Sequence, residues 1–340
     1  MSKATSTPAL SVVIIGRNEG ERLVRCIESV NAMRFSAGEI EMVYVDSDST
    51  DGSAEKAAAL GAKVIVVHPD RPSAAIGRNT GWKMATAPIV MFLDGDCVLH
   101  PDFAAQAAQS FANPKLAAVF GNLRELRPEA SVFNRVLDLD WISQPGPSEF
   151  CGGNALIRRA AIEQVNGFDE TLIAGEEPEM CCRMRACGYE ILHLDLPMAG
   201  HDLAMTRASQ YLRRAFRTGH AYAEVAARFW GTEIPLWERE VRRTLIHAGF
   251  LLMLFSAGII ASVVTLSPMP FLLAIGVFLL LALRTAIRYG WKSDDPVTRL
   301  LYGIHSHLQQ IPILCGQLSY WLNRWTGRRQ RLIEYKETAR

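Results

Sequence analysis

The sequence lacks several features that would place it in a common class of protein. Lysine and arginine number 36 against 35 aspartates and glutamates, so no excess of positive charge points to a nucleic-acid partner. Short internal repeats and low-complexity runs are absent, which argues against solenoid and fibrous folds. The first ten residues have no apolar core followed by a cleavage site, so we expect no secretory signal.

Cysteine is scattered along the chain rather than paired. None of the seven cysteines forms the CxxC spacing that is typical of a structural zinc site. Cys181, Cys182 and Cys187 lie close together, but one such cluster without a second is weak evidence for a metal. We therefore expect reduced cysteines in a cytosolic setting.

Two long apolar runs follow residue 243. Residues 245–266 are almost wholly apolar and match the roughly 20 residues that cross a bilayer, and residues 271–287 form a second run. The loop between them is uncharged, whereas cationic side chains flank the pair at Arg239, Arg242, Arg243, Arg284, Arg288 and Lys292. By the positive-inside rule we expect a transmembrane hairpin with both flanks in the cytoplasm. A buried helical hairpin of a soluble protein is the alternative.

Residues 297–327 carry apolar side chains at helical spacing and end in tryptophans and arginines. This pattern predicts an amphipathic helix that lies on the cytoplasmic leaflet and is kinked at Pro312. Packing of this helix against the catalytic domain is the alternative.

The chain before residue 230 alternates strand and helix signals. Short β-branched runs predict strands at 10–15, 41–46, 63–67 and 89–94, and amphipathic stretches predict helices at 19–33, 53–60 and 74–85. Such alternation predicts an α/β fold with a mainly parallel sheet covered by helices. Ligands of these sheets bind outside the carboxyl ends of the strands.

Charged side chains follow three of the expected strands. Arg17 and Glu19 come after the first strand, Asp46 ends the second, and Asp94-Gly95-Asp96 ends the fourth. These side chains could converge on one crevice at the edge of the sheet. No GxGxxG segment follows the first strand, so a dinucleotide fingerprint is missing.

Asp94 and Asp96 offer oxygen ligands of the kind that magnesium and manganese prefer, with phosphates and water filling the other positions. A cation held there would neutralise a departing diphosphate. A solvated turn is the alternative, because Asp-Gly-Asp is also ordinary turn chemistry.

Four segments occur in an order and at spacings that resemble the family 2 glycosyltransferases, which have the GT-A fold. SVVIIGRNE (11–19) resembles the opening strand, and VDSDSTDGS (45–53) resembles the VDDGSTDGT segment. AIGRNTG (75–81) resembles the ARNxG helix start, and FLDGD (92–96) matches the metal-binding DxD. The resemblance runs from Ser11 to about Arg217 and is of the bacterial type with a C-terminal membrane hairpin.

The resemblance implies a role in donor binding for several residues. It places Asp46 at the nucleoside-contacting position, and it leaves the role of Asp48 open because Ser47 replaces the usual second aspartate. Arg78 would approach the donor. Arg17, Glu19 and Asp94 would help to seat the nucleotide, and Asp96 with Asp94 would hold the divalent cation.

The second half of the resemblance concerns the acceptor. The segments GGN (152–154), GFDE (167–170) and GEEPEMCCR (175–183) resemble the acceptor region and its acidic ED motif. Glu177 occupies the position of the catalytic base, with Glu176 beside it, although aspartate is more usual there. A hydroxyl acceptor needs proton removal as it attacks, so a positioned carboxylate suits this role. A charged helix N-terminus is the alternative interpretation.

His201 falls where many family members place a residue that closes over the metal or the diphosphate, so its imidazole is a further candidate ligand. The QxxRW signature of processive polysaccharide synthases is absent. With only two expected membrane spans, this favours a transferase of single sugars over a polymerising channel.

We therefore expect an inner-membrane protein whose catalytic domain faces the cytoplasm. The expected parts are a flexible N-terminus (1–9), a GT-A domain (10–230), a linker (231–243), a transmembrane hairpin (244–290), the amphipathic helix (297–327) and a basic tail (328–340).

The expected reaction is inverting, metal-dependent transfer of a sugar from a nucleoside-diphosphate sugar to a hydroxyl of a lipid-linked or membrane-proximal glycan. Three alternatives remain. A polyprenyl-phosphate glycosyltransferase has an anionic acceptor and needs no general base. A nucleotidyltransferase would release pyrophosphate. An inactive scaffold would bind the sugar nucleotide without turnover.

Overall fold

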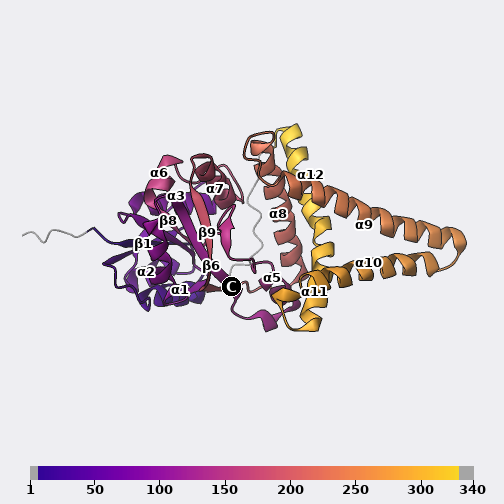
Figure 1. The fold of residues 1–340 in the computed structure, drawn as a ribbon, viewed down its shortest axis with the longest axis horizontal. Helices are drawn as coiled ribbons and strands as arrows, with labels where there is room; N and C mark the ends of the chain where they lie inside the picture. The colour runs from indigo at the N-terminus through magenta and orange to yellow at the C-terminus, as the bar shows by residue number, and fades with distance from the viewer. Residues whose placement is uncertain (1–6, 329–340) are drawn as a thin grey trace, which may run out of the picture. The chain divides into compact units, whose positions relative to one another are not determined.

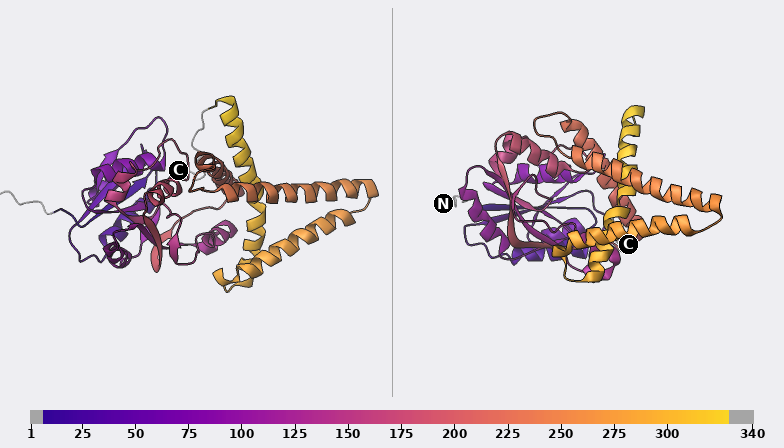
Figure 2. Two further views of the ribbon diagram at one scale, coloured as in Figure 1. Left: turned by 45° about the horizontal axis from the view of Figure 1, so that its top comes forward. Right: turned by 45° about the vertical axis from the view of Figure 1, so that its right-hand side comes forward.

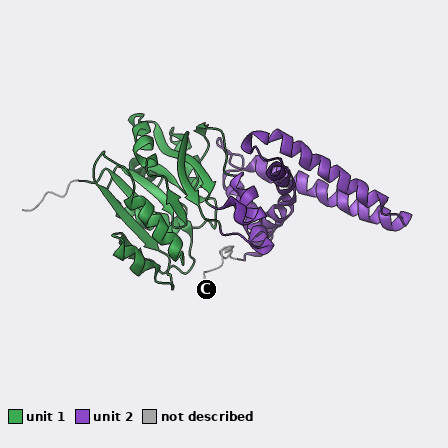
Figure 3. Ribbon diagram, turned by 90° about the horizontal axis from the view of Figure 1, so that it is seen from below, with its two compact units in different colours: residues 1–126, 141–203, 336–340 green, residues 127–140, 204–335 purple. Residues whose placement is uncertain are grey.

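The computed structural model describes residues 7–328, which form two compact units. Within this range the first unit comprises residues 7–126 and 141–203, and the second comprises residues 127–140 and 204–328 (Figure 3). The expected domain 10–230 thus contributes residues to both units. Of the expected basic tail, residues 329–340 lie outside the described residues.

The first unit is built on one mixed sheet, which has nine strands among the described residues (Figure 1). The strand order is β3-β2-β1-β4-β8-β6-β9-β5, and β7 pairs with β9. The strands are β1 (Leu10–Gly16), β2 (Ile40–Asp46), β3 (Lys63–Val66), β4 (Ile89–Asp94), β5 (Cys97–Leu99), β6 (Leu116–Glu125), β7 (Gly146–Ser148), β8 (Ala155–Arg158) and β9 (Glu190–His201).

The predicted α/β fold is confirmed, and its four predicted strands are parallel neighbours in the order β3-β2-β1-β4. The sheet changes direction after β4. Strand β8 is antiparallel to β4 and β6, β6 is parallel to β9, and β5 and β7 are antiparallel to β9. The sheet is therefore mixed rather than mainly parallel: its N-terminal half is parallel, and β6 and β9 form one further parallel pair.

Helices cover both faces of this sheet. They are α1 (Glu21–Asn31), α2 (Ser53–Ala59), α3 (Ala74–Met84), α4 (Phe103–Ala108), α6 (Arg159–Gln164) and α7 (Glu176–Ala186), with a 3-10 turn η1 (Gln109–Ala112). Alternate residues of a strand point to opposite faces. In β1, Val12 and Ile14 pack into the core with α1, α2 and α4, whereas Val13 and Ile15 pack into the core with α3, α6 and α7. Burial on both faces explains why β1 is a continuous apolar run.

The second unit is helical. It contains α5 (Val132–Asp138), α8 (Ala208–Phe229), α9 (Glu238–Thr265), α10 (Met269–Arg288), α11 (Pro296–Leu308) and α12 (Gln310–Thr326), with 3-10 turns η2 (Pro128–Ala130) and η3 (Gly290–Lys292). Helices α9 and α10 form a hairpin (Figure 2) and are long and apolar enough to cross a membrane. Only 17% and 22% of their most apolar windows are buried, which is unlike a core helix of a soluble protein. By length and composition, they support a membrane hairpin.

The helix expected at 297–327 with a kink at Pro312 is divided into two helices. Helix α11 ends at Leu308 and α12 begins at Gln310. The cause is Pro312, because a proline ring clashes with the carbonyl of the residue four positions earlier, which here is Leu308. The break therefore lies one turn before the proline rather than at it.

Helix α12 packs closely on α8 (Figure 1). A Cβ at Gly316 would lie 2.0 Å from the carbonyl oxygen of Phe216, and a Cβ at Gly219 would lie 1.9 Å from that of Ile313. The two backbones touch at this pair of glycines, since no side chain fits between them. The opposite side of α12 leaves Leu318, Trp321, Leu322 and Trp325 exposed.

Candidate active site

The loops after β1 and β2 are tied together beside the predicted nucleotide residues. Asp46 is buried, and its carboxylate accepts hydrogen bonds from the hydroxyl of Tyr44 (2.8 Å) and the backbone N–H of Ser49 (2.7 Å). Asn18 accepts from the N–H of Thr50 (2.8 Å), and its own N–H donates to Oγ of Ser49 (2.9 Å). Asn18 joins the two loops through this network, which strand periodicity could not predict because the contacts are made by turn residues.

Glu19 lies beside the Asp-Gly-Asp turn. Its carboxylate pairs with Arg22 at 2.9 Å, and its Cγ would be 3.4 Å from a Cβ at Gly95. The N–H of Gly95 donates to the carbonyl of Ile15 at 2.9 Å, which joins the ends of β1 and β4. Arg17 is exposed on the same loop.

Asp48 has a left-handed backbone, with φ of 64°. The glycine of the VDDGSTDGT segment stands at this position, and aspartate tolerates this conformation better than most residues. Its carboxylate is half exposed and pairs with Nδ1 of His68 at 2.8 Å. The backbone conformation thus accounts for how an aspartate is accommodated at this point of the motif.

Arg78 is the centre of a buried cluster of charges. Its guanidinium lies 2.9 Å from Oδ1 of Asp94 and 2.8 Å from Oε1 of both Glu176 and Glu177. The structure therefore brings together the predicted donor residue Asp94 and both predicted acceptor-side carboxylates. Three carboxylates surround one cation, so their charges are not fully balanced within the cluster.

This imbalance affects Glu177. Burial raises the pKa of Glu177 to about 7, and the negative charges of Glu176 and Asp94 act in the same direction, although Arg78 opposes them. A carboxyl group with a pKa near neutrality can accept a proton efficiently under physiological conditions.

The segment before β8 closes over this cluster. A Cβ at Gly153 would lie 2.9 Å from Oδ2 of Asp94 and 3.0 Å from Oε1 of Glu177. The next residue, Asn154, accepts a hydrogen bond from the N–H of Asp94 at 2.8 Å. The antiparallel pairing of β8 with β4 explains this contact, because it brings the start of β8 to the end of β4.

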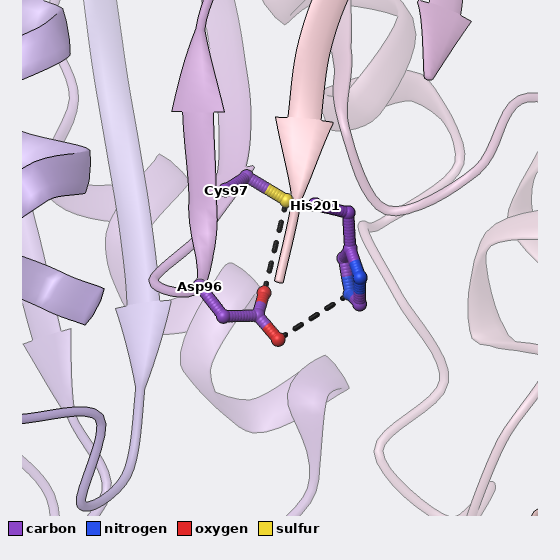
Figure 4. A group of neighbouring side chains, drawn as sticks. All are labelled: Asp96, Cys97 and His201. Atoms are coloured by element: carbon purple, nitrogen blue, oxygen red, sulfur yellow. Dashed lines mark hydrogen bonds and ion pairs between the residues drawn. The ribbon is translucent and has the colours of Figure 1, made fainter. Parts of the chain in front are cut away.

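Asp96 points to a different set of partners (Figure 4). Oδ2 of Asp96 lies 3.3 Å from Nε2 of His201, and the thiol of Cys97 lies 3.7 Å from Oδ1. Their ligand atoms all lie within 4.8 Å, and among residues 7–328 this is the one group of three or more such side chains close enough to hold a metal ion. The turn at Gly95 separates the two aspartates, so Asp94 faces Arg78 while Asp96 faces His201.

The register of the sheet places His201. Its strand β9 lies between β5 and β6, and His201 pairs with Cys97 on one side and with Glu125 on the other. Nδ1 of His201 lies 4.0 Å from Oε2 of Glu125. The ring of Trp141 packs edge-on against the imidazole of His201, with ring centroids 4.9 Å apart. Glu125 and Trp141 were not predicted. The β6–β9 pairing brings Glu125 to His201, and Trp141 lies on the irregular segment before β7.

The donor set fits a hard divalent cation. A carboxylate and an imidazole are ordinary ligands for manganese and acceptable ones for magnesium. Nδ1 of His201 is buried and makes no hydrogen bond within the described residues, which leaves one ring nitrogen for a further ligand or water. The thiol of Cys97 is a soft ligand and suits a hard divalent cation poorly. Asp96 and His201 are therefore the residues that would hold the ion.

Comparisons with known proteins agree on one family. The model described as "Glycosyl transferase family 2" matches residues 11–165, and that described as "Glycosyl transferase family group 2" matches residues 89–290. The chain is similar to glycosyltransferase AglE of Haloferax volcanii, with 24% identity over 65% of this chain and 75% of the relative. It is also similar to the pre-mycofactocin glycosyltransferase of Mycobacterium tuberculosis, with 28% identity over 67% of this chain but only 49% of the relative.

A solved structure shares the fold. The mannosyltransferase PcManGT of Pyrobaculum calidifontis, in complex with GDP-Man and Mn2+, superimposes with a TM-score of 0.61 and 16% identity, covering 94% of this chain and 89% of that one. Its likeness supports the GT-A fold, and the family models span the DxD and acidic motifs. The protein belongs to glycosyltransferase family 2 and is a glycosyltransferase.

Proposed function

We propose that the protein transfers a sugar from a nucleoside-diphosphate sugar to a hydroxyl group of a lipid-linked or membrane-proximal glycan. The observation that carries this proposal is the position of Glu177. Its carboxyl group has a pKa of about 7 and shares Arg78 with the donor-side Asp94. A base that is tuned to neutrality and held beside the donor residues is what a hydroxyl acceptor requires.

The donor side is assigned to the loops after β1, β2 and β4. Asp46 seats the nucleoside, with Arg17, Glu19 and Asp48 on the surrounding loops. Asp96 and His201 hold a divalent cation, magnesium or manganese, which supplies neutralisation of the diphosphate as it leaves. The bound GDP-Man and Mn2+ of the Pyrobaculum mannosyltransferase support this assignment by analogy of fold.

The acceptor side is assigned to Glu177, which takes the proton of the attacking hydroxyl in a direct displacement with inversion. Glu176 supports it by holding Arg78 from the same helix and by keeping the local charge negative. Arg78 acts through the carboxylates that it aligns, because Asp94, Glu176 and Glu177 already engage its terminal nitrogens.

The membrane location follows from α9 and α10. Their exposed apolar surfaces and flanking arginines support a hairpin in the inner membrane with the catalytic domain in the cytoplasm. The exposed tryptophans and leucines of α12 support contact of that helix with the membrane surface. An enzyme held at the membrane meets lipid-linked acceptors at high local concentration, which favours this acceptor class.

The test is a donor-panel assay on the full-length protein in detergent. UDP-, GDP- and dTDP-sugars are supplied with MnCl2 or MgCl2, and the release of nucleoside diphosphate is measured. Glu177→Gln is expected to lower kcat by about 10²- to 10⁴-fold. Glu163→Gln is the control for the change of a carboxyl group to an amide, because Glu163 pairs with Arg159 at 2.8 Å on α6, away from the cluster.

Three results would redirect the proposal. Unchanged transfer to polyprenyl phosphate by Glu177→Gln would indicate the polyprenyl-phosphate enzyme, whose acceptor is already an anion. Pyrophosphate as the product would indicate a nucleotidyltransferase. Metal-dependent nucleotide binding without release of product from any donor would indicate a binding scaffold.

A further inference from the structure

The side-chain amide of Asn79, one residue after Arg78, is fully used by hydrogen bonds. Its Oδ1 accepts from the backbone N–H of Phe168 and from Nε1 of Trp82, both at 2.9 Å. Its Nδ2 donates to the carbonyl of Phe168 and to Oε1 of Glu170, both at 2.8 Å. Asn79 is buried, and its amide hydrogen-bonds to both the backbone N–H and the backbone carbonyl of Phe168.

The two hydrogen bonds between Asn79 and the backbone of Phe168, which we call the clamp, fix the position of the Phe168 ring. The ring meets Phe92 edge-to-face, with centroids 5.3 Å apart and planes at 90°. The guanidinium carbon of Arg78 lies 5.8 Å from the centre of the same ring, within the range of a cation–π contact. Phe168 therefore contacts the side chain that pairs with Asp94, Glu176 and Glu177.

The loop that carries Phe168 has little freedom to move. Gly167 has φ of +71°, and a Cβ there would lie 2.5 Å from Oδ1 of Asn79. From the other side, Arg183 donates to the carbonyl of Gly167 at 2.8 Å. The loop is thus held between α3 and α7, the two helices that carry Arg78 and Glu177.

The guanidinium of Arg78 is contacted by carboxylates and by the ring of Phe168. Its terminal nitrogens face Asp94, Glu176 and Glu177, and its Nε is buried without a hydrogen bond among the described residues. The ring of Phe168 lies at cation–π distance from the same guanidinium and adds an apolar contact to these three ion pairs.

We propose that Asn79 and Phe168 are positioning residues for the transfer reaction. By clamping Phe168, Asn79 keeps the guanidinium of Arg78 where it aligns Asp94 on the donor side with Glu177 on the acceptor side. The inference rests on the proposed function, in which Glu177 is the base. It predicts that loss of the ring impairs turnover more than it impairs nucleotide binding, because Asp46, which seats the nucleoside, lies at the end of β2.

The test compares Phe168→Leu and Phe168→Tyr in the full-length protein in detergent. Phe168→Leu removes the ring and keeps an apolar side chain, so kcat for nucleoside diphosphate release is expected to fall about 10²-fold, as a displacement of about 1 Å would cause. The affinity for GDP or UDP with MnCl2, measured by calorimetry, is expected to stay within about threefold. Phe168→Tyr retains the ring and is expected to restore most of kcat. Asn79→Ala, which releases the clamp itself, is expected to reproduce the loss.

Trp82→Phe is the matched control. It removes one hydrogen bond from Oδ1 of Asn79 and costs stability in the same core, but it leaves both bonds to Phe168 in place. Its kcat is expected to stay near that of the wild type at temperatures below unfolding. Equal losses of kcat in Trp82→Phe and Phe168→Leu at matched melting temperature would overturn the proposal, as would Phe168→Leu and Asn79→Ala with unchanged kcat. Unchanged turnover in Glu177→Gln would instead overturn the proposed function, so the two failures are distinguishable.

Discussion

A side chain at position 153 would collide with Arg78, because a Cβ on Gly153 would lie 2.4 Å from Nη2 of Arg78. The same Cβ would approach Asp94 and Glu177 to 3.0 Å or less. Gly153 thus lies against the side chains of Asp94, Arg78 and Glu177 at the same time. Its lack of a side chain is required by the packing of the cluster.

Gly153→Ala is therefore expected to displace Arg78 and lower kcat by about 10²-fold, since small misplacements at a reacting centre are costly. Overpacking of this kind is also expected to destabilise the protein by about 1–3 kcal/mol. Gly152→Ala is the control, because a Cβ at Gly152 has no heavy atom within 4 Å. Turnover of nucleotide sugar and the melting temperature are measured for both. Equal behaviour of the two variants would show that the close contact at Gly153 is unimportant.

The pH dependence of turnover is expected to follow Glu177. A base must be deprotonated to act, and the pKa of Glu177 is about 7, so kcat/KM is expected to rise with pH through about 7 and then level off. Glu176→Gln removes a neighbouring negative charge that raises this pKa, so the rise is expected to move to lower pH. A profile that is flat between pH 5.5 and about 8 would contradict the assignment of the base.

The same shift has a consequence for stability. The folded-state pKa of Glu177 is raised above the usual value of 4.5, so the folded protein binds the proton more tightly than the unfolded chain. The stability that this proton contributes is present at low pH and is lost as pH rises through about 7. As the pH rises from 4.5 to about 7, the melting temperature of the wild type is expected to fall more than that of Glu177→Gln. An identical pH dependence in both proteins would contradict the raised pKa.

Metal binding is expected to depend on Asp96 and His201 but not on Cys97. Asp96→Ala is expected to abolish tight binding of Mn2+, because it removes the carboxylate ligand. His201→Gln is expected to weaken binding about 10- to 100-fold. Cys97→Ala should bind as the wild type does, since a soft thiol is a poor ligand for manganese. Manganese titration by calorimetry or electron paramagnetic resonance gives these affinities, and a loss of binding in Cys97→Ala would contradict the proposed ligand set.

The membrane hairpin is tested by one substitution at two depths. Leu280 and Ile287 are both exposed on α10, at 67% and 71%, but Ile287 lies beside Arg284 and Arg288 at the end of the helix. Leu280→Lys places a charge near the middle of the span, at a cost of about 2.5–3.5 kcal/mol, whereas a lysine at 287 can reach the head groups. Leu280→Lys is therefore expected to reduce the carbonate-resistant membrane fraction, and Ile287→Lys to leave it intact. Recovery of the wild type in the soluble fraction would rule out the hairpin.

The sequence predicted the parallel half of the fold because each of its strands contains an apolar run of four or more residues and a helix directly follows β1, β2 and β3. It could not predict β5 and β7, which have only three residues each and no measurable periodicity. Nor could it predict that residues 127–140 leave the sheet unit, since that depends on contacts distant in sequence.

The candidate site was predicted in part for the same reason. Residues at strand ends, such as Asp46 and Asp94, could be placed at one edge of the sheet from the pattern alone. The separate directions of Asp94 and Asp96 depend on the turn at Gly95, and the contact of Glu125 with His201 depends on the β6–β9 register. Side-chain direction after a turn and pairing between distant strands are set by tertiary structure.

The reversal of direction between β4 and β8 has a consequence for how the enzyme can vary. Asp94 and Asn154 are neighbours at one edge of the sheet although 60 residues separate them along the chain. The intervening segment returns to the sheet as β5, β6 and β7, so most of it is fixed by strand pairing. Residues 127–140 lie between β6 and β7 and contribute no strand to the sheet. Relatives can therefore differ in length at 127–140 while the pairing of β4 with β8, and with it the reactive centre, stays the same.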